Sequence, residues 1–232
     1  MGFLTIAVFH FLLFQTFVNG SNIIDYLQHN NQSILCFGDS LTHGMLVLSP
    51  TNWHQTHPYS IKLKEMTKLN TIESGVNGQT ANVMQNRITH ALQHAKTSGD
   101  DVGIVSILAG TNDLGYKEPA DKITSHVINI HNKVFDVAAM HNKKIFTIAI
   151  TIPMISWGIN DTARFDINKN LREFQILHKD KVVLVDLENE FDQKLEENKK
   201  YWSTDLAHFS ALGYDTIASK IFHAMQTFEI VS

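Results

Sequence analysis

The sequence predicts an α/β fold in which helices cover both faces of a parallel sheet. Short apolar runs alternate along the chain with longer segments of helical period. Several of the runs are apolar at successive positions, which is typical of strands buried on both faces. Loops that are long for such a fold follow two of the runs, at residues 45–57 and 156–160. In open α/β sheets the ligand crevice lies at the carboxyl ends of the strands, where such loops gather.

Five apolar runs are the predicted strands. They are Ile34–Phe37, Thr71–Glu73, Val102–Leu108, Ile145–Ile150 and Val182–Val185. Five segments of helical period alternate with them, at Tyr59–Leu69, Thr80–Lys96, Lys122–His141, Arg164–His178 and Ala211–Phe228. No internal repeat, low-complexity tract or interdomain linker interrupts this order, so residues 21–232 are expected to form a single domain.

The composition excludes some classes of partner. The chain has 232 residues, of which 44% are hydrophobic, and this is enough for one substantial core. Only 18% are charged, the formal net charge is −4, and the lysines and arginines are scattered rather than clustered. Because nucleic-acid-binding proteins carry a basic surface, no nucleic acid partner is expected. The sequence indicates no particular oligomeric state.

The first 20 residues are predicted to be a signal peptide. Residues 3–18 are almost all apolar, and residues 18–20 suit cleavage by signal peptidase. The apolar run is shorter than the ~20 residues that a spanning helix needs, and His10 and Gln15 interrupt it. An uncleaved signal anchor is the alternative, since no Lys or Arg precedes the run. We therefore expect a secreted, extracellular domain with no stable membrane span.

Cys36 is the only cysteine, so the exported domain would have no internal disulfide. It lies within an apolar run, where a buried and unreactive thiol is expected. Asn31 and Asn160 each begin an N-glycosylation sequon. On a eukaryotic secretory route both could carry glycans, and the protein would then be a glycoprotein.

Three short motifs carry the groups that acyl transfer needs. They are Gly-Asp-Ser-Leu-Thr at 38–42, Gly-Thr-Asn-Asp at 110–113 and Asp-Leu-Ala-His at 205–208. They follow the first, third and fifth predicted strands, so they are expected to meet at one edge of the sheet. A serine hydroxyl becomes a nucleophile when a histidine accepts its proton, and a carboxylate orients that histidine. The motifs therefore predict a triad of Ser40, His208 and Asp205.

The attack would create an oxyanion, which amide donors stabilise. The Ser40 backbone N–H is one candidate, the Asn112 side chain is another, and the glycine-bearing turn at residues 73–80 supplies others. Loss of a single such donor typically costs about 10²–10³ in turnover.

From Ile34 to Phe222 the chain resembles the SGNH hydrolases, the GDSL-type esterases and lipases. The motifs at 38–42 and 205–208 match the family's nucleophile and terminal aspartate–histidine blocks, and Asn112 matches its oxyanion-hole asparagine. Gly78 aligns better than Gly75 with its oxyanion-hole glycine. The resemblance implies a three-layer α/β/α sandwich with a flavodoxin-like five-stranded parallel sheet. It also implies hydrolysis of carboxylic esters through an acyl-enzyme on Ser40, without a metal or organic cofactor.

Each motif has a simpler interpretation when taken alone. Residues 39–40 could cap a helix, residues 112–113 could form a turn, and Asp205 could be a cap beside a solvated histidine. Their joint occurrence in order at strand ends favours the catalytic interpretation. His90 and His94 have the spacing of a zinc site, but Ala91 stands where a zinc protease needs glutamate, so no metal is expected.

The sequence leaves the substrate open among short acyl or acetyl esters, acetylated glycans and lysophospholipids. Trp53, Trp157 and Trp202 each follow a predicted strand, so they could line a substrate pocket or anchor long loops. One alternative is a catalytically silent secreted binding protein on the same scaffold. Another is a thioesterase or acyltransferase that uses the same residues.

Overall fold

Five parallel strands form the central sheet of the computed structural model, which describes residues 22–49, 51–52, 55–155 and 161–230. Their order across the sheet is β4-β1-β5-β6-β7. The bounds are β1 Ser33–Gly38, β4 Thr71–Gly75, β5 Val102–Leu108, β6 Phe146–Ile150 and β7 Val182–Val185. In chain order this is 2-1-3-4-5, the flavodoxin-like arrangement. The predicted fold class is confirmed, and all five predicted strands are present.

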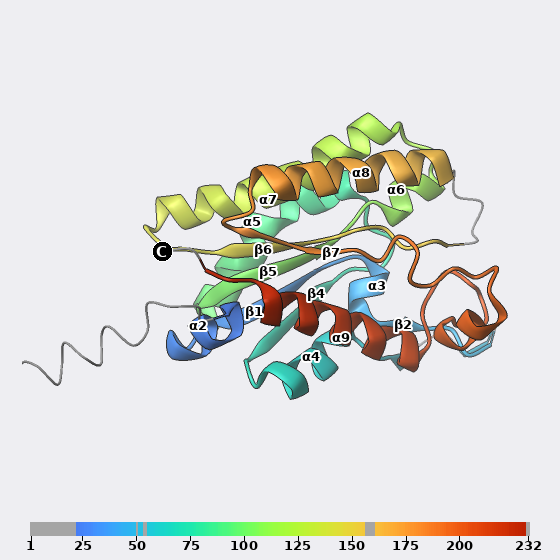
Figure 1. The fold of residues 1–232 in the computed structure, drawn as a ribbon, viewed down its shortest axis with the longest axis horizontal. Helices are drawn as coiled ribbons and strands as arrows, with labels where there is room; N and C mark the ends of the chain where they lie inside the picture. The colour runs from blue at the N-terminus through green and yellow to red at the C-terminus, as the bar shows by residue number, and fades with distance from the viewer. Residues whose placement is uncertain (1–21, 50, 53–54, 156–160, 231–232) are drawn as a thin grey trace, which may run out of the picture.

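Helices cover both faces of the sheet (Figure 1). On one face lie α5 (Ala81–Thr97), α7 (Ala120–Met140) and α8 (Asp161–Leu177). On the other lie α2 (Ile23–His29), α4 (Tyr59–Thr67) and α9 (Ala211–Thr227). Strand β1 is buried on both sides: Ile34 and Cys36 belong to the core under α4 and α9, and Leu35 and Phe37 to the core under α5 and α7.

Several short elements were not predicted. They are α2, α3 (Ser40–His43), α6 (Thr111–Gly115), β2 (Met45–Leu46), β3 (Gln55–Thr56) and the 3₁₀ helix η1 (Glu196–Tyr201). Elements this short are poorly defined by a repeating pattern of apolar residues. The predicted helix at 59–69 also ends early, because Lys68 adopts a left-handed conformation with φ 60° and closes α4 at Thr67.

Gly38 determines how β1 passes into α3. A Cβ atom at this position would lie 2.0 Å from Thr42 Oγ1 and 2.7 Å from the Leu108 carbonyl oxygen, so only glycine fits. The next residue, Asp39, caps α3 by accepting a 2.9 Å hydrogen bond from the Leu41 N–H. Together the two residues place Ser40 at the first position of a helix at the carboxyl edge of the sheet.

Two other predictions concern the thiol of Cys36 and a membrane span. Cys36 is fully buried, and burial raises the pKa of its thiol to about 12, which keeps it protonated. No helix in the described part of the chain is long and apolar enough to cross a bilayer. The expected signal peptide at residues 1–20 lies outside the described residues.

The buried His131 on α7 is expected to make the fold sensitive to acid. Its Nδ1 lies 2.8 Å from Thr147 Oγ1, and burial lowers its pKa from 6.5 to about 3. Between these values the unfolded chain binds a proton that the native protein does not, so the free energy of unfolding decreases as pH falls. We expect His131→Gln to make this decrease shallower by about 1.4 kcal/mol per pH unit between pH 6 and 4.

Urea unfolding at several pH values measures that slope. His90→Gln, which replaces an exposed histidine on α5, is the control and should follow the wild type. If His131→Gln also keeps the wild-type slope, His131 does not contribute to the acid sensitivity.

Candidate active site

Ser40, His208 and Asp205 form one continuous series of hydrogen bonds. Ser40 Oγ lies 2.9 Å from His208 Nε2, and His208 Nδ1 lies 2.6 Å from Asp205 Oδ2. Ser40 begins α3, whereas the other two residues lie in the loop between η1 and α9. Ser40 and His208 are 168 positions apart in the chain. The fold therefore brings together a hydroxyl, an imidazole and a carboxylate in the arrangement that activates a serine.

The loop that carries Asp205 is held by its own carboxylate. Asp205 Oδ1 accepts hydrogen bonds of 3.1 Å from the N–H groups of Ala207 and His208, while Oδ2 meets the His208 ring. Burial alone would raise the pKa of Asp205. The hydrogen bonds from His208 and Ala207 outweigh this effect and hold the pKa below its usual range. The carboxylate thus stays ionised beside the imidazole at neutral pH.

A histidine–carboxylate pair by itself does not mark the site. His57 Nε2 lies 2.8 Å from Asp215 Oδ1, and His43 Nδ1 lies 3.5 Å from Glu73 Oε1. Within the described ranges, only His208 bonds a carboxylate through one ring nitrogen and a serine hydroxyl through the other. The serine contact therefore distinguishes this pair from the others.

A cavity of about 160 Å³ opens at Ser40 and His208. Gly78 and Asn112 also line it, together with Asn77, Thr111 and the apolar residues Leu41, Met45, Ile155 and Ala207. Gly75 is not among its lining residues and packs against the backbone of α3, where an added Cβ would lie 2.2 Å from the His43 nitrogen. Gly78, and not Gly75, therefore shares this cavity with Ser40.

Asn112 faces this region from the start of α6. Its side-chain nitrogen donates hydrogen bonds to the Gln79 carbonyl at 2.9 Å and to Asp39 Oδ2 at 3.2 Å. An amide nitrogen carries two hydrogens, so donation to an oxyanion would replace one of these bonds. The bond to Asp39 is the longer of the two.

Two residues that shape the site, Asp39 and Arg87, were not predicted from the sequence to do so. Asp39 is fully buried, and burial raises its pKa to about 7 although the Leu41 N–H and His208 favour its charged form. The position of Asp39 directly before Ser40 could have indicated a role in the site, but from the sequence it was interpreted only as a possible helix cap. Arg87 on α5 contacts both Gly38 and Gln79, and it belongs to none of the three motifs.

Trp202 is a core residue and does not line the cavity, which corrects its expected place in a substrate pocket. It is 6% exposed, it stacks on Phe209 with ring centroids 4.3 Å apart, and its indole N–H donates to the Phe191 carbonyl. The ring is buried because its single polar group finds an internal acceptor. Trp53 and Trp157 lie outside the described residues.

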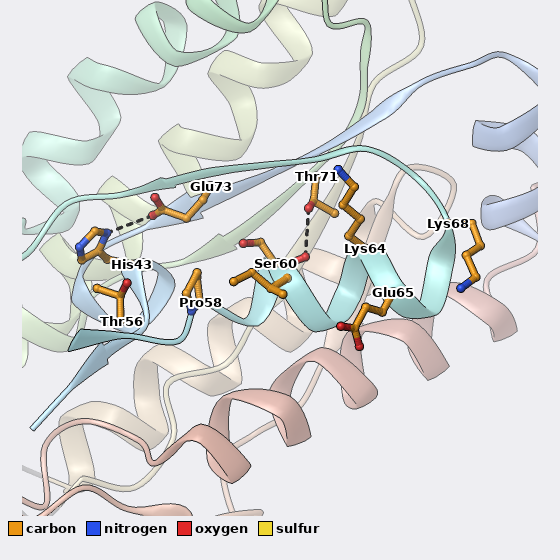
Figure 2. Close-up of a pocket in the computed structure, with 10 residues that line it drawn as sticks. His43, Thr56, Pro58, Ser60, Lys64, Glu65, Lys68, Thr71 and Glu73 are labelled. Carbon is orange, nitrogen blue, oxygen red and sulfur yellow. Dashed lines mark hydrogen bonds and ion pairs between the residues drawn. The ribbon is translucent and has the colours of Figure 1, made fainter. Parts of the chain in front are cut away.

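A larger cavity, of about 680 Å³, lies elsewhere (Figure 2). It runs along the edge strand β4 and the helix α4, and His43 and Glu73 face one another at one end. Neither Ser40 nor His208 lines it. The smaller cavity is the candidate active site, because among the described cavities it alone is lined by both Ser40 and His208.

Residues 36–216 match the profile of the GDSL-like Lipase/Acylhydrolase family. The chain belongs to this family. It is accordingly a serine hydrolase that acts on ester bonds. None of the curated proteins matches the sequence of this family member.

Solved structures of similar fold include three hydrolases. The lipase/acylhydrolase of Enterococcus faecalis is 18% identical with a TM-score of 0.66, and the match covers 85% of this chain and 97% of that one. Est24, a carbohydrate acetylesterase from Sinorhizobium meliloti, is 17% identical with a TM-score of 0.64, covering 83% and 97%. The aryl esterase of M. smegmatis is 14% identical with a TM-score of 0.65, covering 85% and 99%. At these identities the likeness shows a shared fold.

Proposed function

We propose that this family member is a secreted serine esterase that hydrolyses short-chain acyl esters through an acyl-enzyme on Ser40. One observation carries the assignment of residues. His208 lies 2.9 Å from the Ser40 hydroxyl and 2.6 Å from the Asp205 carboxylate, at a cavity large enough for a small acyl group.

In the first half of the reaction, Ser40 Oγ attacks the ester carbonyl carbon while His208 Nε2 accepts the hydroxyl proton. Asp205 accepts the Nδ1–H bond throughout, which fixes the tautomer and stabilises the imidazolium. Collapse of the tetrahedral intermediate breaks the bond to the leaving alcohol, and His208 donates the proton it took from Ser40 to that oxygen. The product that remains is an ester between the acyl group and Ser40.

In the second half, a water molecule replaces the alcohol. His208 removes a proton from the water as it attacks the acyl-enzyme, and then returns the proton to Ser40 Oγ as the carboxylic acid leaves. The proton taken from Ser40 leaves with the alcohol and Ser40 regains one from water, so the protons balance, and no step requires a metal or organic cofactor.

Three groups around the cavity are the proposed oxyanion donors. The Ser40 N–H belongs to the first turn of α3, where backbone N–H groups have no acceptor inside the helix. Gly78 supplies a second N–H from the turn before α5, and Asn112 supplies its side-chain amide. The two backbone N–H groups can stabilise the developing charge without reorganisation, whereas Asn112 would exchange its longer bond, to Asp39, for one to the oxyanion.

The size of the cavity supports a short acyl chain. Its volume of about 160 Å³ equals roughly five times the ~30 Å³ that one water-sized group occupies. Leu41, Met45 and Ile155 provide apolar surface for a few carbons. Acyl groups of about two to four carbons therefore fit, and acetylated glycans join simple acetates as candidate substrates. Est24, which shares the fold, is a carbohydrate acetylesterase.

A chain-length series of p-nitrophenyl esters tests this proposal. We expect kcat/KM to be greatest for acetate to butyrate and to fall by at least about tenfold by octanoate, because the longer chain exceeds the cavity. Met45→Ala should move the optimum toward longer chains by removing part of the wall. One extra or missing methylene in an apolar pocket typically changes discrimination by a factor of about 10 to 200.

Met140→Ala is the control for this series, because Met140 is 77% exposed at the end of α7 and does not line the cavity. It should keep the wild-type optimum. A wild-type enzyme that prefers octanoate would refute the short-chain proposal. A folded wild-type protein that hydrolyses no ester in the series would favour the silent binding protein.

Export is part of the same proposal. It rests on the apolar run at residues 3–18 and on the sequon at Asn31, which is an exposed residue. Expression of the full chain in a secreting eukaryotic host tests it. We expect the mature protein in the medium to begin near residue 21 and to lose mass on removal of N-glycans, and retention of residues 1–20 would instead support a signal anchor.

A further inference from the structure

One guanidinium joins three backbone segments behind the candidate active site. Arg87 Nη2 donates to the Gly38 carbonyl at 2.9 Å, and Nη1 donates to the Ser74 carbonyl at 3.2 Å and hydroxyl at 2.9 Å. Nε donates to Gln79 Oε1 at 2.7 Å. The group also stacks over the Phe37 ring, 4.1 Å from its centroid.

The turn at residues 76–78, which carries Gly78, is joined directly to β1 by the 3.1 Å hydrogen bond from the Val76 N–H to the Gly38 carbonyl. All three of its residues are exposed, and a Cβ atom built on Gly78, whose φ is +74°, would meet nothing within 4 Å. The turn is flanked by Ser74 and Gln79, and both are bonded to Arg87. Its position relative to the core is thus determined mainly at its two ends.

The third segment bonded to Arg87 is the end of β1, which leads to the nucleophile Ser40. The Gly38 carbonyl accepts hydrogen bonds from both Arg87 and the Val76 N–H, and Gly38 precedes Ser40 by two residues. Gln79 also accepts, through its carbonyl, the 2.9 Å bond from Asn112. Arg87 therefore connects the strand before Ser40 with the turn of Gly78 and, through Gln79, with Asn112.

From these contacts we infer that Arg87 is a positioning residue that sets the distance between the Ser40 nucleophile and the Gly78 donor. The inference rests on the proposed function of these residues. Oxyanion donors act only when they lie about 2.7–3.1 Å from the developing charge. A displacement of about 1 Å in such a site can cost on the order of 10² in rate.

The planar fork of arginine, and not merely its charge, is what this role requires. The side chain uses three nitrogens to reach acceptors on three separate segments. A lysine ammonium is a single point charge on a flexible stem and cannot span them together. Arg87→Lys therefore separates geometry from charge.

The test measures kcat and KM for p-nitrophenyl acetate with Arg87→Lys and Arg87→Ala. We expect kcat to fall about 10–100-fold in both variants, with KM changed less than about threefold, because the oxyanion forms only in the transition state. Thermal unfolding shows whether each variant is folded at the assay temperature. If the alanine variant does not fold, the lysine variant decides the result.

Arg172→Lys is the matched control, since Arg172 on α8 bonds Asp186 and Glu188 and does not line the cavity. It should keep kcat within about twofold. Wild-type kcat in a folded Arg87→Lys, or a rise in KM without a loss of kcat, would overturn the inference. If the wild-type protein and the Arg172 control both fail to hydrolyse the ester, the proposed function fails instead.

Discussion

Replacement of Ser40 by alanine is expected to lower kcat for acetate esters by about 10⁴-fold or more, with little change in the temperature of unfolding. The substitution removes the atom that would form the acyl bond, and Ser40 Oγ has no other side-chain partner than His208 among the described contacts. Loss of a nucleophile from a hydrogen-bonded triad removes the function of its other members as well, which is why the effect is so large.

Kinetics and covalent labelling with an alkyl phosphonate provide the measurement. The wild-type protein should gain the mass of one phosphonyl group on Ser40, and Ser40→Ala should not. Ser125→Ala, an exposed position on α7, is the matched control and should behave as the wild type. Wild-type turnover by Ser40→Ala would exclude this serine as the nucleophile.

Asp205→Asn is expected to lower kcat by about 10³–10⁴-fold. The carboxylate accepts the Nδ1–H of His208, whereas an asparagine can turn its NH₂ group toward the ring and favour the wrong tautomer. The effect should appear mainly in kcat, because Asp205 does not line the cavity that would hold the acyl group. Steady-state kinetics with p-nitrophenyl acetate tests this.

The chain contains a matched control for that substitution. Asp215 Oδ1 lies 2.8 Å from His57 Nε2, so Asp215→Asn also alters a histidine–carboxylate pair, but one without a serine partner. Its kcat should stay within about threefold of the wild type. Equal losses in the two variants would show a general effect on the fold, and no loss in Asp205→Asn would remove Asp205 from the triad.

The architecture could be predicted because its signals are local. The strands β1, β5 and β7 are largely apolar at successive positions, and their burial on both faces follows from helices packed above and below the sheet. The positions of the three motifs after strands then placed them at one edge. The short helices α3 and α6 escaped prediction, because they are made by caps and by glycine geometry rather than by apolar periodicity.

The site was predictable only as a set of chemical groups. Ser40, Asp205 and His208 could be named because their residue types and order match the chemistry of acyl transfer. The sequence left a pocket role and an anchoring role open for Trp202, because a tryptophan after a strand can face the core as well as a pocket, and only packing against Phe209 excludes the pocket role. Asn112 could likewise be named as a donor from its residue type, but only the structure shows that its amide is bonded to Asp39 and to the Gln79 carbonyl.

By itself, the sequence determined the fold class, the family and the identities of the reactive groups, since each depends on residue type and on spacing along the chain. The tertiary structure decided the distances: His208 to Ser40 rather than to any other serine, Gly78 rather than Gly75 at the cavity, and Arg87 bonded to three segments. The reason is physical. Hydrogen bonding and close packing act over a few ångströms between residues that lie far apart in the chain, so they exist only after the sheet and its helices have assembled.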